Sequence, residues 1–465
     1  MKNNARLLIS CAAALALAGC GNLAPKYDVP AVETPTAFKE GRGVWEPAKP
    51  NDAVERGAWW ELFDDPVLND LASKVEVSNQ NVAAAVAAYA QARAVTQEQR
   101  ASLFPTVDLN GNANRSGGGN GPTRSSYQVN MGVTWEPDVF GRLRAGLQSA
   151  RASEQASQAD LASARLAAQG ELAVNYFNLR EMDLTRALQQ ETIAGYRRSL
   201  EIARNRYNAG IVARTDVLQA ETQLANAEAD MLTLERQRAQ SEHAIAVLIG
   251  RAPSNFNLAP DVKVKLHVPR IPEAVPSTLL QRRPDIAAAE RRVAQANAQI
   301  GVARAGFFPS IRLSGQAGYT AASIGDLFSA SAFAWSLGAS LAQTIFDAGA
   351  TRARVAQSRA ALEESSARYR QTVLTAFEDV ENQLVALRVL EQQQALRQRA
   401  FEASALVEQQ VMNRYKAGQV NYTEVINAQT SAANARRALV QAQIDRQVAA
   451  VALIQALGGG WGGVQ

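Results

Sequence analysis

Cysteine and histidine are scarce in this chain. Its 465 residues include two cysteines, Cys11 and Cys20, and two histidines, His243 and His267. Because both cysteines lie close to the start, no disulfide framework can stabilise the rest of the chain. Two histidines leave little for His-based catalysis or zinc binding. A phosphate-binding glycine loop and a nucleophile elbow are also missing. We therefore expect a protein that is not an enzyme and needs no cofactor.

Long apolar runs and a strong net charge are absent as well. After Cys20 there is no uncharged apolar run of about 18 residues, so the sequence predicts no transmembrane helix. The formal net charge is only +4. The sequence has no basic cluster that would predict a nucleic-acid partner.

The first residues are typical of a lipoprotein signal peptide. Lys2 and Arg6 precede an apolar run over 7–18, and small residues stand directly before Cys20. Cleavage before Cys20 would let this residue carry three acyl chains, which is more than stable membrane anchoring needs. The alternative is an ordinary secretory peptide with an incidental cysteine.

Gly21 follows Cys20, so the aspartate that commonly retains lipoproteins in the inner membrane is absent. We therefore expect an outer-membrane lipoprotein. We assign residues 1–19 to the signal peptide and residues 20–58 to an extended linker that begins at the lipidated cysteine.

The rest of the chain is one unit written twice. The segment RYNAG at 206–210 returns as RYKAG at 414–418. Each half has the pattern helix, strand, strand, long helix, turn, long helix. We place the first repeat at 59–250, a Pro-rich linker at 251–278 and the second repeat at 279–460.

Gaps in the proline distribution predict very long helices. None of the 16 prolines lies between Pro137 and Pro253, and none follows Pro309. A helix over 139–208 would be on the order of 100 Å long. Part of the second repeat has apolar residues in steps of four and three, which predicts a coiled-coil seam. These residues are Val373, Phe377, Val380, Leu384 and Leu387.

Four shorter segments alternate between apolar and polar residues. Each is about ten residues long, which is the length that a tilted membrane strand needs. A half-buried sheet in a soluble protein gives the same alternation. The apolar members are Val107, Leu109 and Ala113; Tyr127, Val129, Met131, Val133 and Trp135; Ile311, Leu313, Ala317 and Tyr319; and Phe333, Trp335, Leu337 and Leu341.

Four strands cannot close a barrel, and an open sheet edge is excluded from the hydrocarbon core. Several copies must therefore share one barrel. The eight strands of a dimer would leave an interior filled by side chains, whereas the twelve strands of a trimer would leave a water-filled lumen. The expected fold class is thus α plus transmembrane β-barrel, with polar strand faces toward water, apolar faces toward lipid, and exposed loops at 115–126 and 320–332.

Three motifs identify a known family. They are WWELFDDPVL at 59–68, RRPDI at 282–286 and LGGGW at 457–461. In this combination the chain resembles the outer-membrane factor (TolC-like) family, and within it the lipoprotein branch of the OprM or NodT type. The resemblance covers essentially the whole chain after the signal peptide.

The resemblance implies a homotrimer in the outer membrane, with a 12-stranded barrel on a 12-helix periplasmic tunnel. Its function would be to act as the passive exit duct of a tripartite efflux pump for drugs and other small molecules. Its partners would be a periplasmic adaptor (membrane-fusion) protein, an inner-membrane RND-type pump and outer-membrane lipid. The alternatives are the duct of a type I protein secretion system and a non-conducting scaffold lipoprotein.

The resemblance also assigns roles to the turns between the long helices. The turns are expected to contact the adaptor, and residues just beside them are expected to form the periplasmic gate. The second turn departs from the family pattern, because Asn427 replaces the second of two common acids and Val420 replaces an arginine found in some members. The adaptor contacts are Ala209, Gly210, Ile211, Val212, Ala417, Gly418, Gln419 and Val420, and the gate residues are Thr215, Asp216, Tyr415, Glu424 and Asn427.

Overall fold

The computed structural model describes residues 23–35, 38–40, 57–119, 122–264, 266–269 and 282–459. The predicted signal peptide, Cys20 and most of the linker predicted at 20–58 lie outside these residues. The chain divides into two compact units. The first consists of Met1–Val32, Ala87–Gln158 and Ala288–Gln371, and the second of Glu33–Val86, Ala159–Ala287 and Thr372–Gln465.

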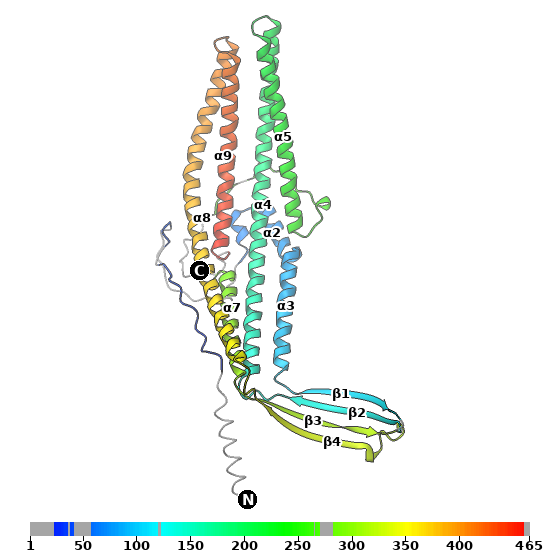
Figure 1. The fold of residues 1–465 in the computed structure, drawn as a ribbon. Coiled ribbons are helices and arrows are strands. Elements are labelled where there is room, and N and C mark those ends of the chain that lie inside the picture. Colours follow the sequence, from blue (N-terminus) through cyan, green and yellow to red (C-terminus); the bar gives the residue numbers. More distant parts are fainter. Residues whose placement is uncertain are drawn as a thin grey trace. The chain divides into compact units, whose positions relative to one another are not determined.

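The two repeats have the same order of elements (Figure 1). Helix–strand–strand–helix–helix occurs first as α3–β1–β2–α4–α5 and again as α7–β3–β4–α8–α9. Both long helices have 67 residues and both return helices have 35. The elements are η1 (Trp59–Phe63), α2 (Pro66–Ser78), α3 (Gln80–Ala101), β1 (Thr106–Ser116), β2 (Arg124–Trp135), α4 (Arg142–Asn208), α5 (Arg214–Leu248), η2 (Pro253–Asn255), α7 (Pro284–Ala305), β3 (Ser310–Ala321), η3 (Ala330–Ala332), β4 (Phe333–Ala342), α8 (Ala350–Lys416) and α9 (Tyr422–Ala456).

Helix α4 begins at Arg142, three residues after the predicted start at 139. The Asp138 carboxylate explains the boundary, because it accepts hydrogen bonds from the backbone N–H groups of Leu143 (3.0 Å) and Arg144 (2.8 Å). It thereby satisfies two of the N–H groups that have no partner within the helix.

The four strands form one antiparallel sheet in the order β1-β2-β3-β4. Its register pairs Leu109 with Met131, Met131 with Ala317, and Ala317 with Trp335. Residues that pair directly point to the same face of a sheet. The register therefore gathers the apolar members of all four strands on one face and the polar members on the other.

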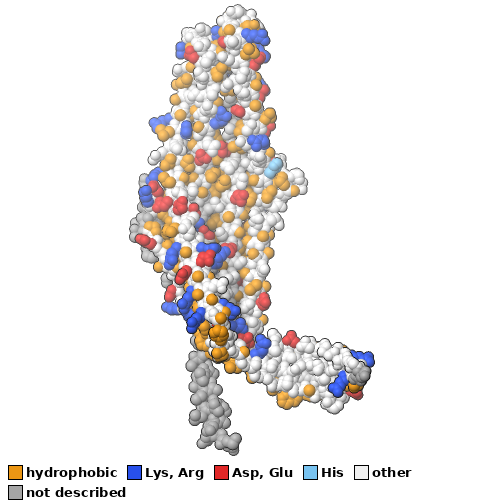
Figure 2. All heavy atoms as spheres, in the orientation of Figure 1, with side chains coloured by type: hydrophobic (Ala, Val, Ile, Leu, Met, Phe, Trp, Pro, Cys, Tyr) orange, Lys and Arg blue, Asp and Glu red, His pale blue; other side chains and the backbone are white. Residues whose placement is uncertain are grey.

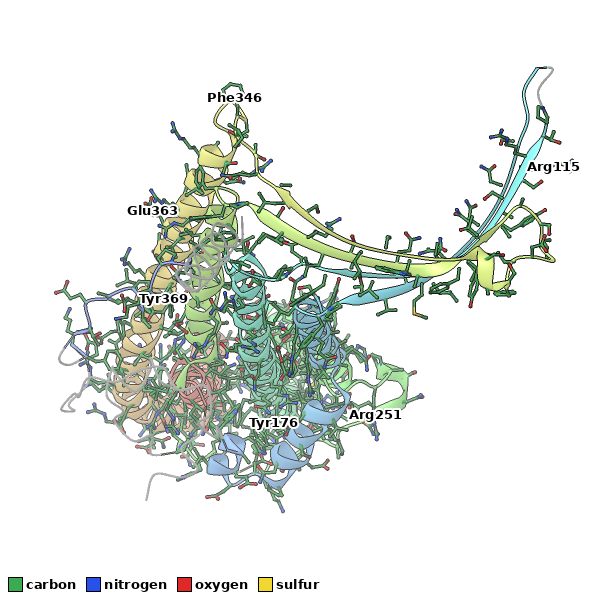
Figure 3. All side chains as sticks on the ribbon, turned by 90° about the horizontal axis from the view of Figure 1, so that it is seen from below. Arg115, Tyr176, Arg251, Phe346, Glu363 and Tyr369 are labelled. Carbon is green, nitrogen blue, oxygen red and sulfur yellow. The ribbon has the colours of Figure 1, made fainter. Side chains whose placement is uncertain are left out.

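The loops at the far end of the sheet are shorter than predicted. The loop expected at 115–126 is reduced because β1 extends to Ser116 and β2 begins at Arg124, and β3 continues to Ala321. Polar residues at the ends of these strands continue the ladder, since backbone pairing does not depend on side-chain polarity. Figure 3 shows side chains on both faces of the strands, with Arg115 and Phe346 at opposite ends of the sheet.

Within the first unit, α7 binds the extended segment at the start of the described chain. Asn297 donates a hydrogen bond to the carbonyl oxygen of Pro25 (2.9 Å), and Arg304 donates to that of Leu23 (3.1 Å). The segment that begins at Leu23 therefore runs along a helix.

Within the second unit, each repeat has a contact between the residue before its first helix and the end of its last helix. The Asn79 amide donates to the carbonyl oxygen of Leu248 at the end of α5 (2.8 Å). The Arg283 guanidinium donates to that of Ala456 at the end of α9 (3.3 Å). Each helix end thus gains a partner for a carbonyl that the helix itself leaves unpaired.

The predicted coiled-coil seam is largely buried in the second unit. Val373, Phe377 and Val380 are buried, and Leu384 and Leu387 are half-buried. None of the helices over the described residues combines the length and the apolar composition that a membrane crossing needs.

Candidate functional site: the tips of the two helical hairpins

Both long hairpins end in the same turn. We call residues 206–213 tip 1 and residues 414–421 tip 2. Gly210 and Gly418 have φ angles of 72° and 77°, in the left-handed region that favours glycine. In each tip the residue after the glycine donates its N–H to the carbonyl of the arginine five positions earlier, at 2.9 Å. This pattern is a helix C-cap of the Schellman type.

The helices that leave the tips differ in their N-caps. Asn421 precedes α9, and its side chain accepts a hydrogen bond from the N–H of Glu424 (3.1 Å). Ala213 occupies the same place before α5 and has no side chain that can cap. Both residues have extended backbone angles, with φ and ψ of −82° and 166° at Asn421 and −76° and 156° at Ala213.

This difference gives a matched pair of expected effects. Asn421→Ala should lower the local free energy of opening of tip 2 by about 1 kcal/mol, and Ala213→Asn should raise that of tip 1 by a similar amount. Hydrogen exchange of the tip amides in the full chain measures both values. If the free energy of opening changed with the same sign in both variants, the assignment of Asn421 as an N-cap and of Ala213 as a position without one would be contradicted.

An apolar cluster beside the tips joins the first hairpin to the second inside the second unit. It contains residues from the tip-proximal ends of both hairpins, so the two hairpins pack on each other near their tips within one chain. The Tyr415 and Tyr422 rings lie 5.4 Å apart at its centre. Its buried members are Leu200, Ala203, Val217, Ala220, Tyr415, Tyr422 and Val425.

Arg206 crosses from tip 1 to tip 2 beside this cluster. Its guanidinium carbon lies 4.5 Å from the centre of the Tyr415 ring, and the same group donates a hydrogen bond to the Tyr415 carbonyl oxygen. A guanidinium within about 6 Å of a ring centre is attracted to the π face. One side chain therefore holds both the ring and the backbone of tip 2.

The Tyr415 hydroxyl is buried, and among the described residues it has no hydrogen-bond partner. Burial raises the pKa of this hydroxyl; the Arg206 charge opposes the shift and the Asp216 carboxylate adds to it. The described residues of a single chain show no hydrogen bond from Tyr415 to Asp216. The bracing of Asp216 by Tyr415 therefore stays a prediction.

The other predicted residues lie around the two turns. Thr215, Glu424 and Asn427 are exposed, and Asp216 is half-buried. Among the expected adaptor contacts, Val212 and Val420 are half-buried, and the exposed ones are Ala209, Gly210, Ile211, Ala417, Gly418 and Gln419.

An open groove of about 290 Å³ lies between α4, α8 and α9 and reaches Lys416 at the start of tip 2. Its lining includes Ser199, Glu408, Gln429 and Arg436. The Gln429 amide donates to the Ser199 hydroxyl (3.1 Å). Burial raises the pKa of the Glu408 carboxyl, and the Arg436 charge opposes the shift. Sequence reasoning missed this groove, although glutamine and arginine in a helix that packs on two others could have signalled it.

The face shown in Figure 2 has basic and acidic side chains mixed along the helices. Exposed charged side chains of α4 and α5 form ion pairs, for example Arg197 with Glu228 (2.7 Å) and Arg204 with Glu221 (2.6 Å). Such exposed pairs stabilise a hairpin only weakly.

Comparison with known proteins decides what these hairpins and this sheet belong to. A family model described as "Outer membrane efflux protein" matches residues 71–251 and 275–459. The chain belongs to the outer membrane efflux protein family. It is 31% identical over 467 residues to the probable efflux pump outer membrane protein TtgC of Pseudomonas putida, covering 98% of this chain and 96% of that protein.

Solved structures of outer membrane efflux proteins share the fold. The outer-membrane channel OprN superposes with a TM-score of 0.84 at 30% identity, covering 95% of this chain and all (100%) of that chain. The open state of the MtrE outer membrane channel of Neisseria gonorrhoeae gives 0.83 at 30% identity, covering 95% and 98%.

These findings confirm three predictions from the sequence. The fold class is that of long helices in two repeats joined to a transmembrane β-barrel. The location is the outer membrane, with the helical part in the periplasm. The function is that of an outer-membrane channel of efflux pumps, and the family is one of channels. The predicted domain boundaries and the roles of individual tip residues stay predictions.

Proposed function

We propose that three copies of this chain form a passive duct through which drugs and other small molecules leave the cell. The observation that carries the proposal is the sheet. One of its faces is apolar and the other polar, and over the described residues its outer strands β1 and β4 are hydrogen-bonded on one side only.

The unpaired edges support the proposed number of copies. Within the hydrocarbon core every backbone N–H and C=O must have a partner. If β4 of one copy pairs with β1 of the next, three copies close twelve strands. The apolar faces then meet lipid, and the polar faces line a lumen wide enough for water.

The helical hairpins support the proposed partners. Six tips, two from each copy, would face a periplasmic adaptor, which in turn would join an inner-membrane RND-type pump. The exposed turn residues of tip 1 and tip 2 are the proposed contacts, because they are free of the packing that holds Tyr415 and Tyr422 in place.

A lipid on Cys20 is the proposed second attachment to the outer membrane. The chain that follows is bound along α7 from Leu23 onward. The anchor would therefore be tied to the helical part within a few residues of the lipidated cysteine.

The gate is proposed at the residues beside the tips. Three-fold symmetry would bring three Glu424 carboxylates toward one axis, with three Asn427 side chains one helical turn farther. Asp216 and Tyr415 would brace the closed state. A ring of like charges in a narrow opening attracts cations, and salt weakens this attraction.

Planar-bilayer recording tests the duct and its gate together. The wild-type protein should conduct ions, prefer cations and be blocked by multivalent cations. Glu424→Gln should weaken the block, and Asn427→Asp should strengthen it, because it adds a second acidic ring. Glu402→Gln, which removes an exposed carboxylate from α8 away from the tip, serves as the control.

Two results would contradict the proposal. A trimer that passes no ions would be a scaffold and not a duct. If block by multivalent cations changed equally in Glu424→Gln and Glu402→Gln, Glu424 would not form the gate.

A further inference from the structure

The contact between Arg206 and Tyr415 has a counterpart in the repeat that is not formed within the chain, the pair Arg414 and Tyr207. The arginine and tyrosine of RYNAG recur in RYKAG, so Arg414 corresponds to Arg206 and Tyr207 to Tyr415. Within the described part of one chain, one of the two possible pairs is formed, that of Arg206 with Tyr415.

The members of the other pair face solvent in the single chain. Arg414 is exposed, and the Tyr207 side chain is 43% exposed, whereas Tyr415 is 1% exposed. Over the residues that the structure describes, the side chains of Arg414 and Tyr207 form no hydrogen bond, ion pair or ring contact. Both nevertheless stand at the same places in the same type of turn as the pair that is formed.

We propose that Arg414 of one copy covers the Tyr207 ring of the next copy and donates to its backbone carbonyl, as Arg206 does to Tyr415 within a chain. The inference rests on the proposed trimer. In a ring where tip 1 and tip 2 alternate, each tip has one neighbour in its own chain and one in the next. Arg206 of tip 1 reaches tip 2 of the same chain. By the same geometry, Arg414 of tip 2 would reach tip 1 of the next chain.

The contact between chains is the weaker of the two. Beneath the Tyr415 ring lies the Tyr422 ring, at 5.4 Å. The residue that corresponds to Tyr422 in the first repeat is Arg214. Tip 1 therefore has an arginine at the position where tip 2 has its second aromatic ring, and we expect the like charges of Arg214 and the incoming Arg414 to repel each other.

This difference predicts where the channel opens. The pair of tips within one chain stays together, since it shares the buried cluster and the Arg206 contact. The three contacts between chains separate. Opening is then a movement of three two-hairpin units relative to one another.

Cross-linking tests the proposed pair in the full-length protein. Tyr207→Cys with Arg414→Cys, treated with a short bis-maleimide, should give covalent dimers and trimers on denaturing gels. Arg206→Cys with Tyr415→Cys should link within the chain and keep the monomer mass. Wild-type protein should give neither product.

The outcomes separate this inference from the proposed function. A native trimer whose Tyr207–Arg414 variant gives no product between chains overturns the inference alone. A protein that is monomeric by native mass overturns the proposed trimer and the inference with it.

Conductance gives an independent readout. Arg414→Gln should raise resting conductance about tenfold, the effect expected when several cation–π contacts are lost together. Arg214→Tyr, which gives tip 1 the aromatic neighbour of tip 2, should lower it below wild type. Lys416→Gln removes an exposed positive charge two residues from Arg414 and should stay close to wild type. Equal effects of Arg414→Gln and Lys416→Gln would reduce the role of Arg414 to its net charge and overturn the proposed contact.

Discussion

Asp183→Ala is expected to destabilise the second unit by about 3–5 kcal/mol, the cost of removing one partner from a buried ion pair. The Asp183 side chain is fully buried. Its carboxylate accepts from Arg180 (2.9 Å) and from Arg238 (2.6 Å), whose side chains are 2% and 10% exposed. Without this carboxylate two guanidinium groups are left in the interior with too little negative charge.

The same carboxylate also holds a segment that follows the first hairpin. It accepts from the backbone N–H of Asp261 (3.1 Å), and its two arginine partners donate to the carbonyl oxygens of Leu258 (2.5 Å) and Ala259 (3.0 Å). Loss of Asp183 should therefore free residues 258–261 before the helices unfold. Hydrogen exchange at these residues and urea unfolding of the whole protein measure the two effects.

Asp230→Ala is the matched control. Asp230 is also an aspartate between helices, but its side chain is 59% exposed and lies 3.9 Å from Arg437. An exposed pair contributes about 0.5 kcal/mol or less. If both variants lost the same stability, the buried network would have no special role.

The sequence predicted those features that depend on local pattern. Strand faces follow from alternation, which has a period of two, so Leu109, Met131, Ala317 and Trp335 could be assigned to one face before their register was known. Turns between helices follow from glycine, because a left-handed residue such as Gly210 has few alternatives. The repeat gave the order of elements twice.

The sequence could not predict which charged residues are buried. Arg180 and Arg238 lie in helices with many arginines, and pattern alone does not distinguish them from the solvated Arg197 and Arg204. Burial depends on the segment that packs over them, here 258–261, which has no periodicity. From sequence alone, a charged residue in a helix is therefore predicted to be exposed unless the segment that packs over it is known.

The repeat itself hid the difference between the tips. Tyr207 and Tyr415 stand in nearly identical motifs, and yet one is exposed and the other buried. The environment of each tyrosine depends on the hairpin that lies beside it. Tyr415 lies beside the first hairpin of its own chain, whereas in the proposed trimer Tyr207 would lie beside a hairpin of the next chain. Identical local sequence fixes the turn but not its neighbours.

The face of the sheet that meets lipid can be tested at β4. The Leu337 side chain is 79% exposed in the single chain, and it pairs with Gly315 on the apolar face. Its neighbour Ser336 pairs with Gln316 on the polar face. On the proposed assignment of faces, one position thus separates a lipid-facing residue from a lumen-facing one.

Aromatic residues near one end of β4 suggest how deep Leu337 would lie in the membrane. The Tyr319 ring lies 5.5 Å from the Phe328 ring and 5.6 Å from the Phe333 ring. Aromatic side chains of this kind gather where barrels leave the hydrocarbon core. Leu337 is near the middle of Phe333–Ala342, so we expect it to lie close to the bilayer midplane.

Leu337→Arg should therefore cost about 2–4 kcal/mol and sharply lower the yield of trimer in the outer membrane. Ser336→Arg, which adds the same side chain one residue away, should assemble normally and shift ion selectivity toward anions. Trimer yield on native gels and reversal potentials in bilayers measure the two effects. Equal yields would contradict the assignment of faces, and reversed yields would mean that the polar face meets lipid, since a shift by one residue exchanges the two faces.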